Sequence, residues 1–441
     1  MQFFDSIEEL HKVCFWYRLN LIALIYKKNN EMFLFYPRHL ESKLIKTFDQ
    51  TKVILTVGAR QVGKSTLLKH LYPEFQTIVF DPIHDEYNVR ENPDLFLKSL
   101  SFPVIFDEIQ FYPEFLSSLK RFVDQRNEMG QCLLTGSQNF SMLRSVSESM
   151  AGRISILNLY PMTFLEKYQI DKPLWIEAYL NRGDLISTIQ SVNVDDVYAL
   201  MWRGGMPGLI GKKDDFVETY FSSYVQTYIE RDVRMLLDIK NISDFSKFIR
   251  LLAMNSGQEI NMAHLGREIG VANSTAIEWR NVLKQSLLLN EIEPFHGNTI
   301  KRLSKKSKGY MMDTGLLCYL SMINSPSMLS KHPKAGAVFE NFVINMLQVY
   351  MNAMMPKVQM YHWRSSLQQE VDLVLEYDGW LYPIEIKLKT KIDSRDVEGI
   401  ESFRSTYQHQ NVHHGIIIYA GDICRYVSDN VIAVPWNSIL N

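Results

Sequence analysis

The sequence contains few cysteines for its length, and none of them is placed like a metal ligand. Only four occur in 441 residues, scattered singly along the chain: Cys14, Cys132, Cys318 and Cys424. This number is too small for a disulfide scaffold of this size, and no pair has the spacing of zinc ligands. The scarcity of cysteine therefore predicts a reducing, cytoplasmic setting.

Long apolar runs and an excess of one charge are also missing. No segment approaches the roughly 20 apolar residues of a membrane helix, so we expect no membrane association. The short apolar run at residues 19–26 follows an acidic start, unlike a signal peptide. The formal net charge is −2, so any nucleic-acid-binding surface has to be local. Two interpretations of residues 1–31 stay open: they form an amphipathic helix, or they are an artefact of start-codon choice.

The chain is too long for one ordinary domain, and its hydrophobic share of 46% is enough for several cores. Strand and helix patterns alternate up to about residue 160, whereas residues 163–235 lack strand signals and read as helices. The predicted organisation has five parts: an N-terminal extension (1–31), a P-loop domain (32–165), a helical lid or connector (166–240), a winged helix (241–330) and a C-terminal α/β domain (331–441).

The P-loop domain is predicted from five apolar, β-branched runs separated by helical stretches. The runs lie at 52–57, 77–81, 103–107, 131–135 and 154–159, with one clear helix at 114–127. Runs that are apolar throughout, without alternation, are typical of strands buried on both faces of a parallel sheet. The pattern therefore predicts a doubly wound α/β fold with right-handed crossovers.

The first strand leads into the phosphate-binding pattern Gly-x-x-x-x-Gly-Lys-Ser at residues 58–65, and a helix pattern follows. In such a loop, backbone N–H groups and a helix N-terminus point at the phosphates, Lys64 reaches the β and γ oxygens, and the Ser65 hydroxyl serves Mg²⁺. The residues expected to bind Mg-ATP are Gly58, Arg60, Gln61, Val62, Gly63, Lys64, Ser65 and Thr66.

A strand that ends in two acids supplies the second half of an ATPase site. Asp107 and Glu108 end the run Val-Ile-Phe-Asp-Glu. Asp107 is predicted to hold the Mg²⁺ shell, as the second acidic element of P-loop enzymes does. Glu108 is placed to orient and deprotonate the attacking water, which predicts hydrolysis and not nucleotide sensing alone.

Two further polar residues are candidates with a plain alternative each. Ser137, after the strand at 131–135, would sense the γ-phosphate or merely form a turn. Arg153 would act as an arginine finger, within the chain or across a subunit boundary of a homo-oligomer, or would be an ordinary surface arginine.

Together the segments GARQVGKSTLL, VIFDEIQ, LLTGSQNF, SMAGRISILNLYPMTF and TYIERDVRMLL resemble the uncharacterised prokaryotic AAA-type ATPases. The similarity covers about residues 32–400. In that family a domain of unknown function follows the ATPase and contains a winged helix and a restriction-endonuclease-like fold. The resemblance implies a sensor role for Ser137 and a functional role for Arg153.

The segment 244–295 predicts three short helices and a hairpin, the order of a winged helix-turn-helix. The third helix would expose Asn273, Ser274, Arg280 and Lys284, together with Glu278. The following loop carries five cations suited to DNA phosphates: Lys301, Arg302, Lys305, Lys306 and Lys308. Winged helices also bind proteins, so DNA contact and protein contact both stay open here.

Near the C-terminus, Asp378-Gly379 lies between two strand patterns and predicts a two-residue hairpin loop. Counting outward from a Tyr377–Trp380 pair sets Asp372 opposite Glu385 on one face of the hairpin, with Lys387 two residues beyond Glu385. Opposed carboxylates repel unless a cation lies between them, so the spacing predicts a site for Mg²⁺ or Mn²⁺.

This Asp…Glu-x-Lys pattern resembles the restriction-endonuclease-like (PD-(D/E)xK) nucleases, with Val371 where that motif has proline. The resemblance implies a further metal ligand on the preceding helix, which Glu340 matches, and a catalytic role for Lys387.

Three functions fit these patterns. The leading one couples ATP hydrolysis to an action on DNA through the winged helix and a metal-dependent nuclease. The second is an ATP-gated regulatory or protein-interaction switch with an inert nuclease-like domain. The third, a small-molecule kinase, is disfavoured by Asp107-Glu108 and by the accessory domains.

Overall fold

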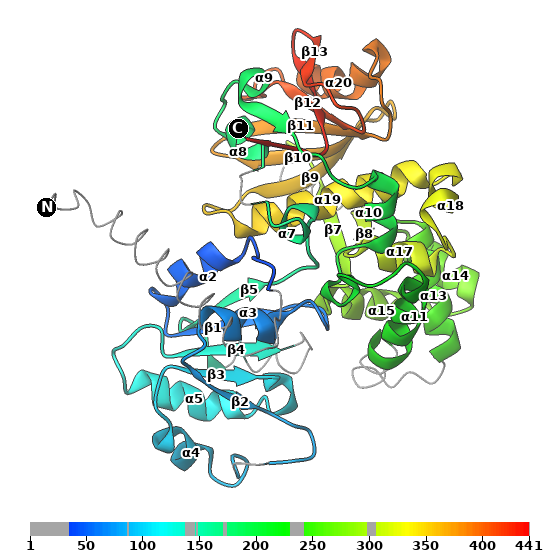
Figure 1. Ribbon diagram of the computed structural model, residues 1–441. Helices are drawn as coiled ribbons and strands as arrows, with labels where there is room; N and C mark the ends of the chain where they lie inside the picture. The colour runs from blue at the N-terminus through cyan, green and yellow to red at the C-terminus, as the bar shows by residue number, and fades with distance from the viewer. Residues whose placement is uncertain are drawn as a thin grey trace, which may run out of the picture. The chain divides into compact units, whose positions relative to one another are not determined.

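The computed structural model describes residues 35–85, 88–136, 146, 149–170, 174–229, 242–297 and 306–440. Within it, Arg38–Asn441 form one compact unit (Figure 1). The predicted extension at 1–31 lies outside the described residues, and so do Ser137, Lys301, Arg302 and Lys305.

The P-loop domain contains a parallel five-stranded sheet in the order β2-β3-β4-β1-β5. Its strands are β1 (Val53–Val57), β2 (Gln76–Val79), β3 (Val104–Asp107), β4 (Cys132–Gly136) and β5 (Ile154–Asn158). The helices of the domain are α2 (Glu41–Phe48), α3 (Lys64–Leu71), α4 (Pro93–Ser99) and α5 (Phe115–Asp124), with a 3₁₀ turn η1 (Ile109–Phe111). The predicted α/β fold and all five predicted strands are confirmed within two residues.

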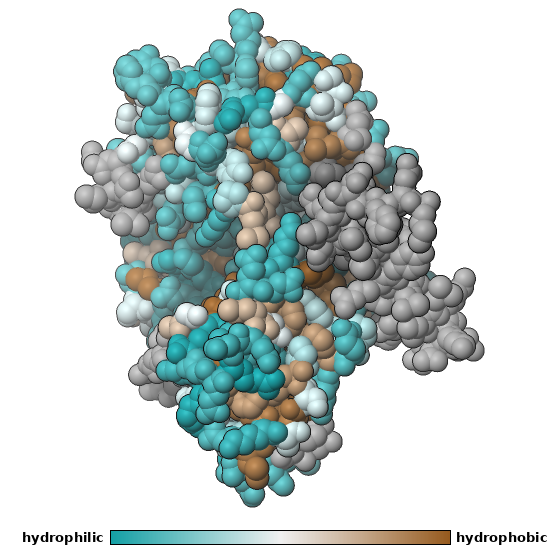
Figure 2. All heavy atoms as spheres, turned by 90° about the vertical axis from the view of Figure 1, so that its left-hand side faces the viewer, coloured by the Kyte–Doolittle hydropathy of each residue, from teal (hydrophilic) through white to brown (hydrophobic). Residues whose placement is uncertain are grey.

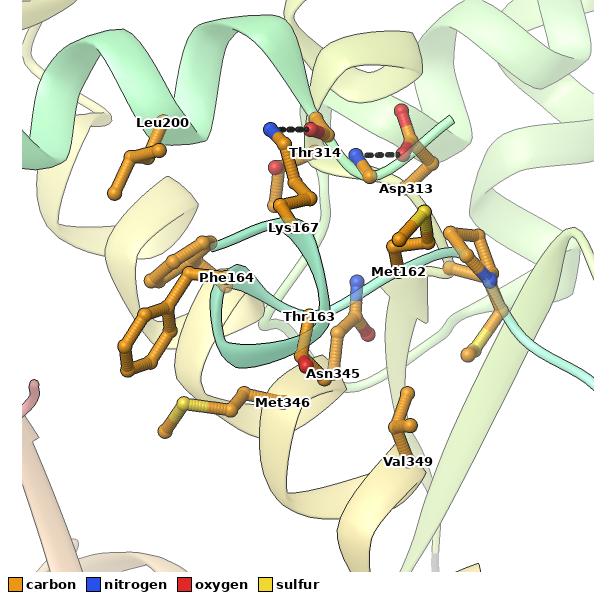
Figure 3. Close-up of a pocket in the computed structure, with 15 residues that line it drawn as sticks. Met162, Thr163, Phe164, Lys167, Leu200, Asp313, Thr314, Asn345, Met346 and Val349 are labelled. Carbon is orange, nitrogen blue, oxygen red and sulfur yellow. Dashed lines mark hydrogen bonds between the residues drawn. The ribbon is translucent and has the colours of Figure 1, made fainter. Parts of the chain in front are cut away.

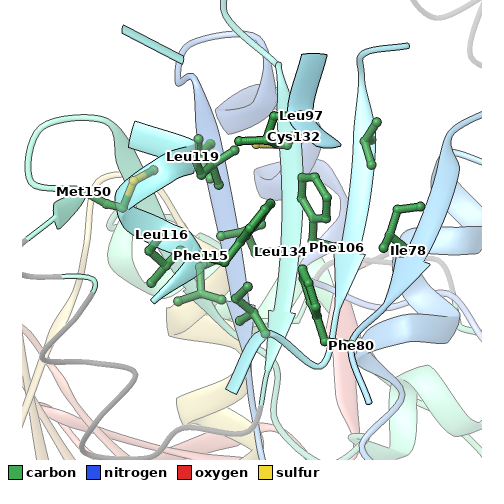
Figure 4. Close-up of a cluster of buried hydrophobic side chains, with 14 of the residues drawn as sticks. Ile78, Phe80, Leu97, Phe106, Phe115, Leu116, Leu119, Cys132, Leu134 and Met150 are labelled. Carbon is green, nitrogen blue, oxygen red and sulfur yellow. The ribbon is translucent and has the colours of Figure 1, made fainter. Parts of the chain in front are cut away.

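A continuous apolar core fixes this sheet (Figure 4). Strands β1, β3 and β4 are buried along their whole length, because helices cover both faces of a parallel sheet. Phe106 of β3 packs edge-on against Phe115 of α5, with ring centroids 5.0 Å apart. Burying each such aromatic ring contributes about 1.5–3 kcal/mol. The core therefore holds the carboxyl ends of β1, β3 and β4 in place at one edge of the sheet.

The segment after this domain is mainly helical, as predicted. It contains α7 (Phe164–Lys167), α8 (Ile176–Leu180), α9 (Leu185–Thr188), α10 (Val197–Arg203), the 3₁₀ turn η2 (Pro207–Leu209), α11 (Asp215–Tyr224) and a π-helical turn η3 (Val225–Ile229). The absence of strands predicted here is wrong at β6 (Ile189–Ser191), which pairs with β15 (Ser438–Leu440). Sequence patterning misses so short a strand because its partner is about 250 residues away.

Three helices and a hairpin follow in the predicted order: α13 (Ile242–Met254), α14 (Met262–Ile269), α15 (Asn273–Gln285), β7 (Leu289–Pro294) and β8 (Lys308–Met311). The remaining helices are α17 (Thr314–Leu320), α18 (Pro326–Lys331), α19 (Ala335–Ala353), the 3₁₀ turn η4 (Ser394–Val397) and α20 (Glu398–Thr406). The remaining strands are β9 (Gln359–Arg364), β10 (Glu370–Tyr377), β11 (Trp380–Lys387), β12 (Gly415–Tyr419), β13 (Arg425–Ser428) and β14 (Val431–Pro435).

The predicted C-terminal hairpin forms in the predicted register. Tyr377 pairs with Trp380, and the ladder runs on to Leu373 with Ile384. Asp378 and Gly379 both have positive φ, 49° and 72°, as the type I′ turn of a two-residue loop requires. The ladder ends at Leu373 and Ile384, and Asp372 and Glu385 are the next residues along the two strands.

The hairpin β7–β8 does not stand apart as a separate wing. Strand β7 pairs in parallel with β9, so both strands belong to one eight-stranded sheet, in the order β13-β14-β12-β11-β10-β9-β7-β8. The sheet thus crosses the boundary predicted at 330/331, and the boundary predicted at 165/166 falls inside α7. Hydrogen bonding between distant strands leaves no mark in local composition, and the two boundaries stay predictions.

The surface carries no sign of a membrane segment in the parts of the chain described. No helix there combines the length and apolar character that a membrane crossing requires. The face shown in Figure 2 is largely hydrophilic, and its hydrophobic side chains occur in separate patches.

Candidate nucleotide-binding site

The predicted phosphate loop lies between the carboxyl end of β1 and the first turn of α3. Gly63, with φ 96°, precedes the helix, and no side chain caps its first N–H groups. A Cβ at Gly58 would lie 2.3 Å from the carbonyl oxygen of Leu159, so only glycine fits there. Helix α3 thus begins at the end of the loop without a side-chain cap, and a helix N-terminus of this kind suits an anionic group.

Lys64 is buried and folds back over the loop. Its ammonium donates to the carbonyl oxygens of Gly58 at 3.1 Å and Ala59 at 2.9 Å. These contacts hold the positive charge beside the loop N–H groups. The position suits a lysine that contacts the phosphates enclosed by the loop.

Ser65 and Asp107, predicted as the Mg²⁺ ligands, meet directly. The Ser65 hydroxyl donates to Asp107 Oδ1 at 2.7 Å, and Asp107 is 5% exposed. The Thr135 hydroxyl donates to the same carboxylate oxygen. A hydroxyl and a carboxylate held side by side are hard oxygen ligands of the kind Mg²⁺ takes. These residues fit the ion that the sequence implies.

Glu108 follows Asp107 with a left-handed backbone, φ 60° and ψ 40°. This conformation is uncommon for a residue with a side chain and is held here by neighbours. The Glu108 N–H donates to Thr135 Oγ1 at 3.2 Å, and the Gln110 amide donates to the Glu108 carboxylate. Glu108 is therefore fixed beside Asp107.

Arg38 forms hydrogen bonds that hold the loop, and sequence patterning did not identify it as a site residue. Its guanidinium donates to the carbonyl oxygens of Val62 at 2.9 Å and Tyr160 at 2.6 Å, and pairs with Glu166 at 3.2 Å. A lone arginine 20 residues before the motif carries no local signal of this role.

The loop also touches the helical segment. The Tyr220 hydroxyl of α11 donates to Gln61 Oε1 at 2.7 Å, and the Tyr224 hydroxyl donates to the carbonyl oxygen of Arg60 at 3.3 Å. The π-helical turn η3 begins at the next residue, and such turns are frequent at functional sites. A change in the loop conformation would therefore alter these contacts with α11.

Arg153 lies beside the start of β1, whereas the phosphate loop follows the other end of this strand. Its carbonyl accepts from the N–H of Val53, the first residue of β1, and its guanidinium pairs with Asp124 at 2.5 Å. The loop begins at the other end of β1, about 16 Å away for five strand residues. An arginine finger acting within the chain is thus excluded, and action across a subunit boundary stays a prediction.

The predicted C-terminal residues come together but include a lysine that sequence patterning assigned elsewhere. Lys308, predicted to contact DNA phosphates, is instead only 4% exposed in β8. Its ammonium lies 3.2 Å from Glu340 Oε1 and 3.5 Å from Asp372 Oδ1, and also pairs with Glu370. Lys387 pairs with Glu385. The DNA-contacting role of Lys308 is therefore corrected: burial and its three carboxylate partners remove it from the surface.

The metal set predicted here, Glu340, Asp372 and Glu385, is not arranged as a chelating group. In the described parts of the chain, no three or more His, Cys, Asp or Glu side chains are grouped so that they could hold a metal ion. Burial, followed by the charge of Asp372, raises the pKa of both Glu340 and Glu385. Both carboxyl groups are therefore protonated more readily than ordinary ones, which reduces the negative charge that the two lysines face.

The predicted DNA-facing cations of the third helix are also engaged. Arg280 bonds to both carboxylate oxygens of Glu291, at 2.6 and 2.9 Å, and Lys284 bonds to the same group at 2.8 Å. In the loop before β8, Lys306 is described and is exposed. Asn273 and Ser274 remain exposed at the start of α15.

A small pocket beneath the segment Pro161–Thr163 offers no second nucleotide site (Figure 3). Its volume of about 40 Å³ has room for a few water molecules. Inside it, Lys167 donates to the carbonyl oxygen of Gly204 at 2.9 Å, and Asp313 accepts from the N–H of Gly205. These bonds join α7, α10 and α17 and indicate a structural junction.

Three family models match this chain. Residues 50–168 match an AAA domain, residues 194–327 match a Domain of unknown function (DUF8612), and residues 335–439 match a Domain of unknown function (DUF4143). The winged-helix and nuclease-like expectations are not tested by these descriptions.

Related chains occur in bacteria and archaea. The uncharacterized proteins Rv2008c of Mycobacterium tuberculosis and Mb2031c of Mycobacterium bovis are each 28% identical over 405 residues, covering 91% of this chain and 84% of theirs. The uncharacterized protein MJ1637 of Methanocaldococcus jannaschii is 26% identical over 333 residues, covering 66% of this chain and 68% of its own.

Two solved structures are similar in part. The Walker-type ATPase PABY2304 of Pyrococcus abyssi has a TM-score of 0.43 at 15% identity, covering 65% of this chain and 96% of that one. The RuvB Holliday junction branch migration motor of Thermotoga maritima has a TM-score of 0.28 at 18% identity, covering 58% and 89%. At these scores neither likeness carries the assignment. The AAA match and the geometry of the loop together identify residues 50–168 as an AAA-type P-loop domain.

Proposed function

We propose that this chain binds Mg-ATP at the loop 58–65 and hydrolyses it. The observation that carries the proposal is the hydrogen bond between Ser65 and Asp107, with Lys64 and Glu108 on either side. Nucleotide binding alone would not need a carboxylate next to Asp107. A Glu whose backbone and side chain are both held in place supports the hydrolytic step.

Each residue has a separate task in this proposal. The loop N–H groups and Lys64 bind the phosphates and offset their charge. Ser65 and Asp107 would hold Mg²⁺, which supplies stabilisation of the charge that develops on the phosphate oxygens. Glu108 accepts the proton of the attacking water, while Gln110 and Thr135 keep it oriented.

Nucleotide affinity with and without Mg²⁺ tests the binding half of the proposal. Lys64→Ala should abolish measurable ATP binding, because it removes the ammonium that meets the β and γ phosphates. Lys69→Ala is the matched control, since Lys69 lies on the same helix and is exposed. Equal affinities in the two variants would contradict the proposal.

For the remaining domains we propose an ATP-gated switch. The contacts of Tyr220 with Gln61 and of Tyr224 with Arg60 support it, because they link the loop to the helices that precede α13. If the switch operates, ATP and ADP should give different hydrogen-exchange protection in α11. Identical protection in both nucleotides would argue against it.

DNA contact is a second candidate, supported by the order α13-α14-α15-β7-β8 and by exposed Asn273 and Ser274. It is tested with duplex DNA at several salt concentrations. Removing the charges of Lys301, Arg302, Lys305 and Lys306 should weaken binding and reduce the salt slope. An unchanged slope would remove this candidate.

A further inference from the structure

The C-terminal carboxylate cluster combines acidic side chains from three elements with two lysines, one of them from a fourth element. Glu340 lies on α19, Glu370 and Asp372 on β10, and Glu385 on β11. Two ammonium groups face them, Lys308 from β8 and Lys387 from β11. So many buried or half-buried charges require close cations, because an unpaired ion in such surroundings is costly.

Lys308 takes the central place among these groups. Its ammonium contacts three of the four carboxylates, Glu340, Glu370 and Asp372, and its side chain is 5% exposed. The Tyr310 hydroxyl, on the same strand, donates to Glu340 Oε1 at 2.7 Å. The β-ladder of Lys308 with Ile292 fixes the backbone from which this side chain reaches in.

The other oxygens of the cluster are engaged as well. Asp372 Oδ2 accepts from the N–H of Ile386 at 2.9 Å, and Lys387 donates to Glu385 Oε1. A divalent ion between Glu340 and Asp372 would share their oxygens with an ammonium already in contact with both. The two cations would repel each other, so this position accommodates one of them.

We propose that the Lys308 ammonium takes the place of a divalent metal in this cluster. The chain's own cation holds Glu340, Glu370 and Asp372 together, so the C-terminal domain binds no metal there and performs no metal-dependent cleavage. Lys308 is a positioning residue. This inference concerns the C-terminal domain and is independent of ATP hydrolysis.

One carboxylate oxygen, on Glu385, is the atom through which a metal could still bind this cluster. Glu385 Oε2 is buried and, among the described residues, has no hydrogen-bond partner. Among the described residues, Lys308 forms ion pairs with Glu340, Glu370 and Asp372 but not with Glu385. If a metal does bind beside Lys308, Glu385 Oε2 and Asp372 are the ligands it would use.

The test measures Mn²⁺ binding and Mn²⁺-dependent melting of the nucleotide-free full chain. Wild type should show no calorimetric Mn²⁺ binding that depends on Asp372 and no change in melting temperature. Lys308→Met should melt lower without Mn²⁺, because it leaves carboxylates unpaired, and Mn²⁺ should restore its melting temperature. The rescue should disappear in Lys308→Met/Asp372→Asn. Lys306→Met, at an exposed lysine two residues away, should behave as wild type.

Two results would overturn the proposal. One is Mn²⁺ binding to wild type that is lost in Asp372→Asn or Glu385→Gln but kept in Lys64→Ala. The other is a folded Lys308→Met that gains no Mn²⁺ site. The measurement of Mn²⁺ binding to wild type does not depend on whether Lys308→Met folds. Lys308→Gln, which keeps hydrogen-bonding capacity, provides a second variant in which the gain of a Mn²⁺ site can be measured.

Discussion

The strongest quantitative prediction concerns Arg38, whose guanidinium joins the phosphate loop to the start of α7. It pairs with Glu166, and the side chains of the two residues are 5% and 2% exposed. The Glu166 carboxylate also accepts from the backbone N–H of His39 and of Thr163, both at 2.8 Å. Replacing Arg38 by Met keeps much of the side-chain volume but leaves Glu166 as a buried charge without its cation.

The expected cost follows from that loss. Removing one partner of a buried ion pair destabilises by about 3–5 kcal/mol. For a compact unit of about 400 residues, such a cost lowers the melting temperature by roughly 4–6 °C. Arg38→Met/Glu166→Gln should recover part of it, because the double variant removes the stranded charge as well.

The pH dependence of the pair has a definite sign. Burial tends to raise the pKa of Glu166, but Arg38, His39 and the two backbone donors outweigh it and hold the pKa below its ordinary value. Stability from a depressed carboxyl pKa is present above the unfolded pKa, about 4.3. It is lost as the pH falls through the lower, folded pKa. The stability difference between wild type and Glu166→Gln should therefore shrink only below about pH 4.

Thermal melts of wild type, both single variants and the double variant measure this coupling. The reasoning is refuted if Arg38→Met melts within about 2 °C of wild type. It is refuted equally if the effects of the two single variants simply add, because contacting charges should show a coupling energy.

Three further predictions concern the loop and its surroundings. Tyr220→Phe should change ATP affinity by about 2–10-fold, which corresponds to the loss of one hydrogen bond. An unchanged dissociation constant in an equilibrium titration would show that the bond from Tyr220 to Gln61 does not contribute to ATP binding. Gly58→Ala should lose ATP binding in the same titration, because its Cβ would meet the Leu159 carbonyl oxygen at 2.3 Å; retained affinity would mean that the loop shifts at no cost. Arg153→Ala should leave ATP affinity unchanged, and a loss of turnover that wild-type subunits restore in mixing experiments would place it across a subunit boundary, whereas unchanged turnover would leave it a surface residue.

The sequence was sufficient where local chemistry decides the structure. Asp378-Gly379 allows positive φ at two successive residues, so the hairpin register could be counted outward to Asp372 and Glu385. The apolar strands of the P-loop domain were equally readable, because burial on both faces leaves uniform runs. In the loop itself, Gly58 is required by its close approach to the Leu159 carbonyl oxygen, and Gly63 by its positive φ.

What the sequence could not reveal depends on contacts between distant segments. Arg38 and Glu166 are 128 residues apart, and neither belongs to a recognisable motif. Lys308 looked like one member of a basic loop, yet β-pairing with β7 turns it towards Glu340 and Asp372. The charge of Lys284 is likewise cancelled by Glu291 on a neighbouring strand. In each case the sequence shows the charged residue but not the residue with which it pairs.

The central claim is that Glu108 drives hydrolysis of bound ATP, and one measurement tests it most directly. Phosphate release and ATP affinity are compared between wild type, Glu108→Gln and Glu114→Gln, an exposed control a few residues further along. Glu108→Gln should bind Mg-ATP as wild type does and lose about 10²–10⁴-fold in turnover, the usual contribution of a general base, while Glu114→Gln stays fully active. Wild-type turnover in Glu108→Gln would contradict the account.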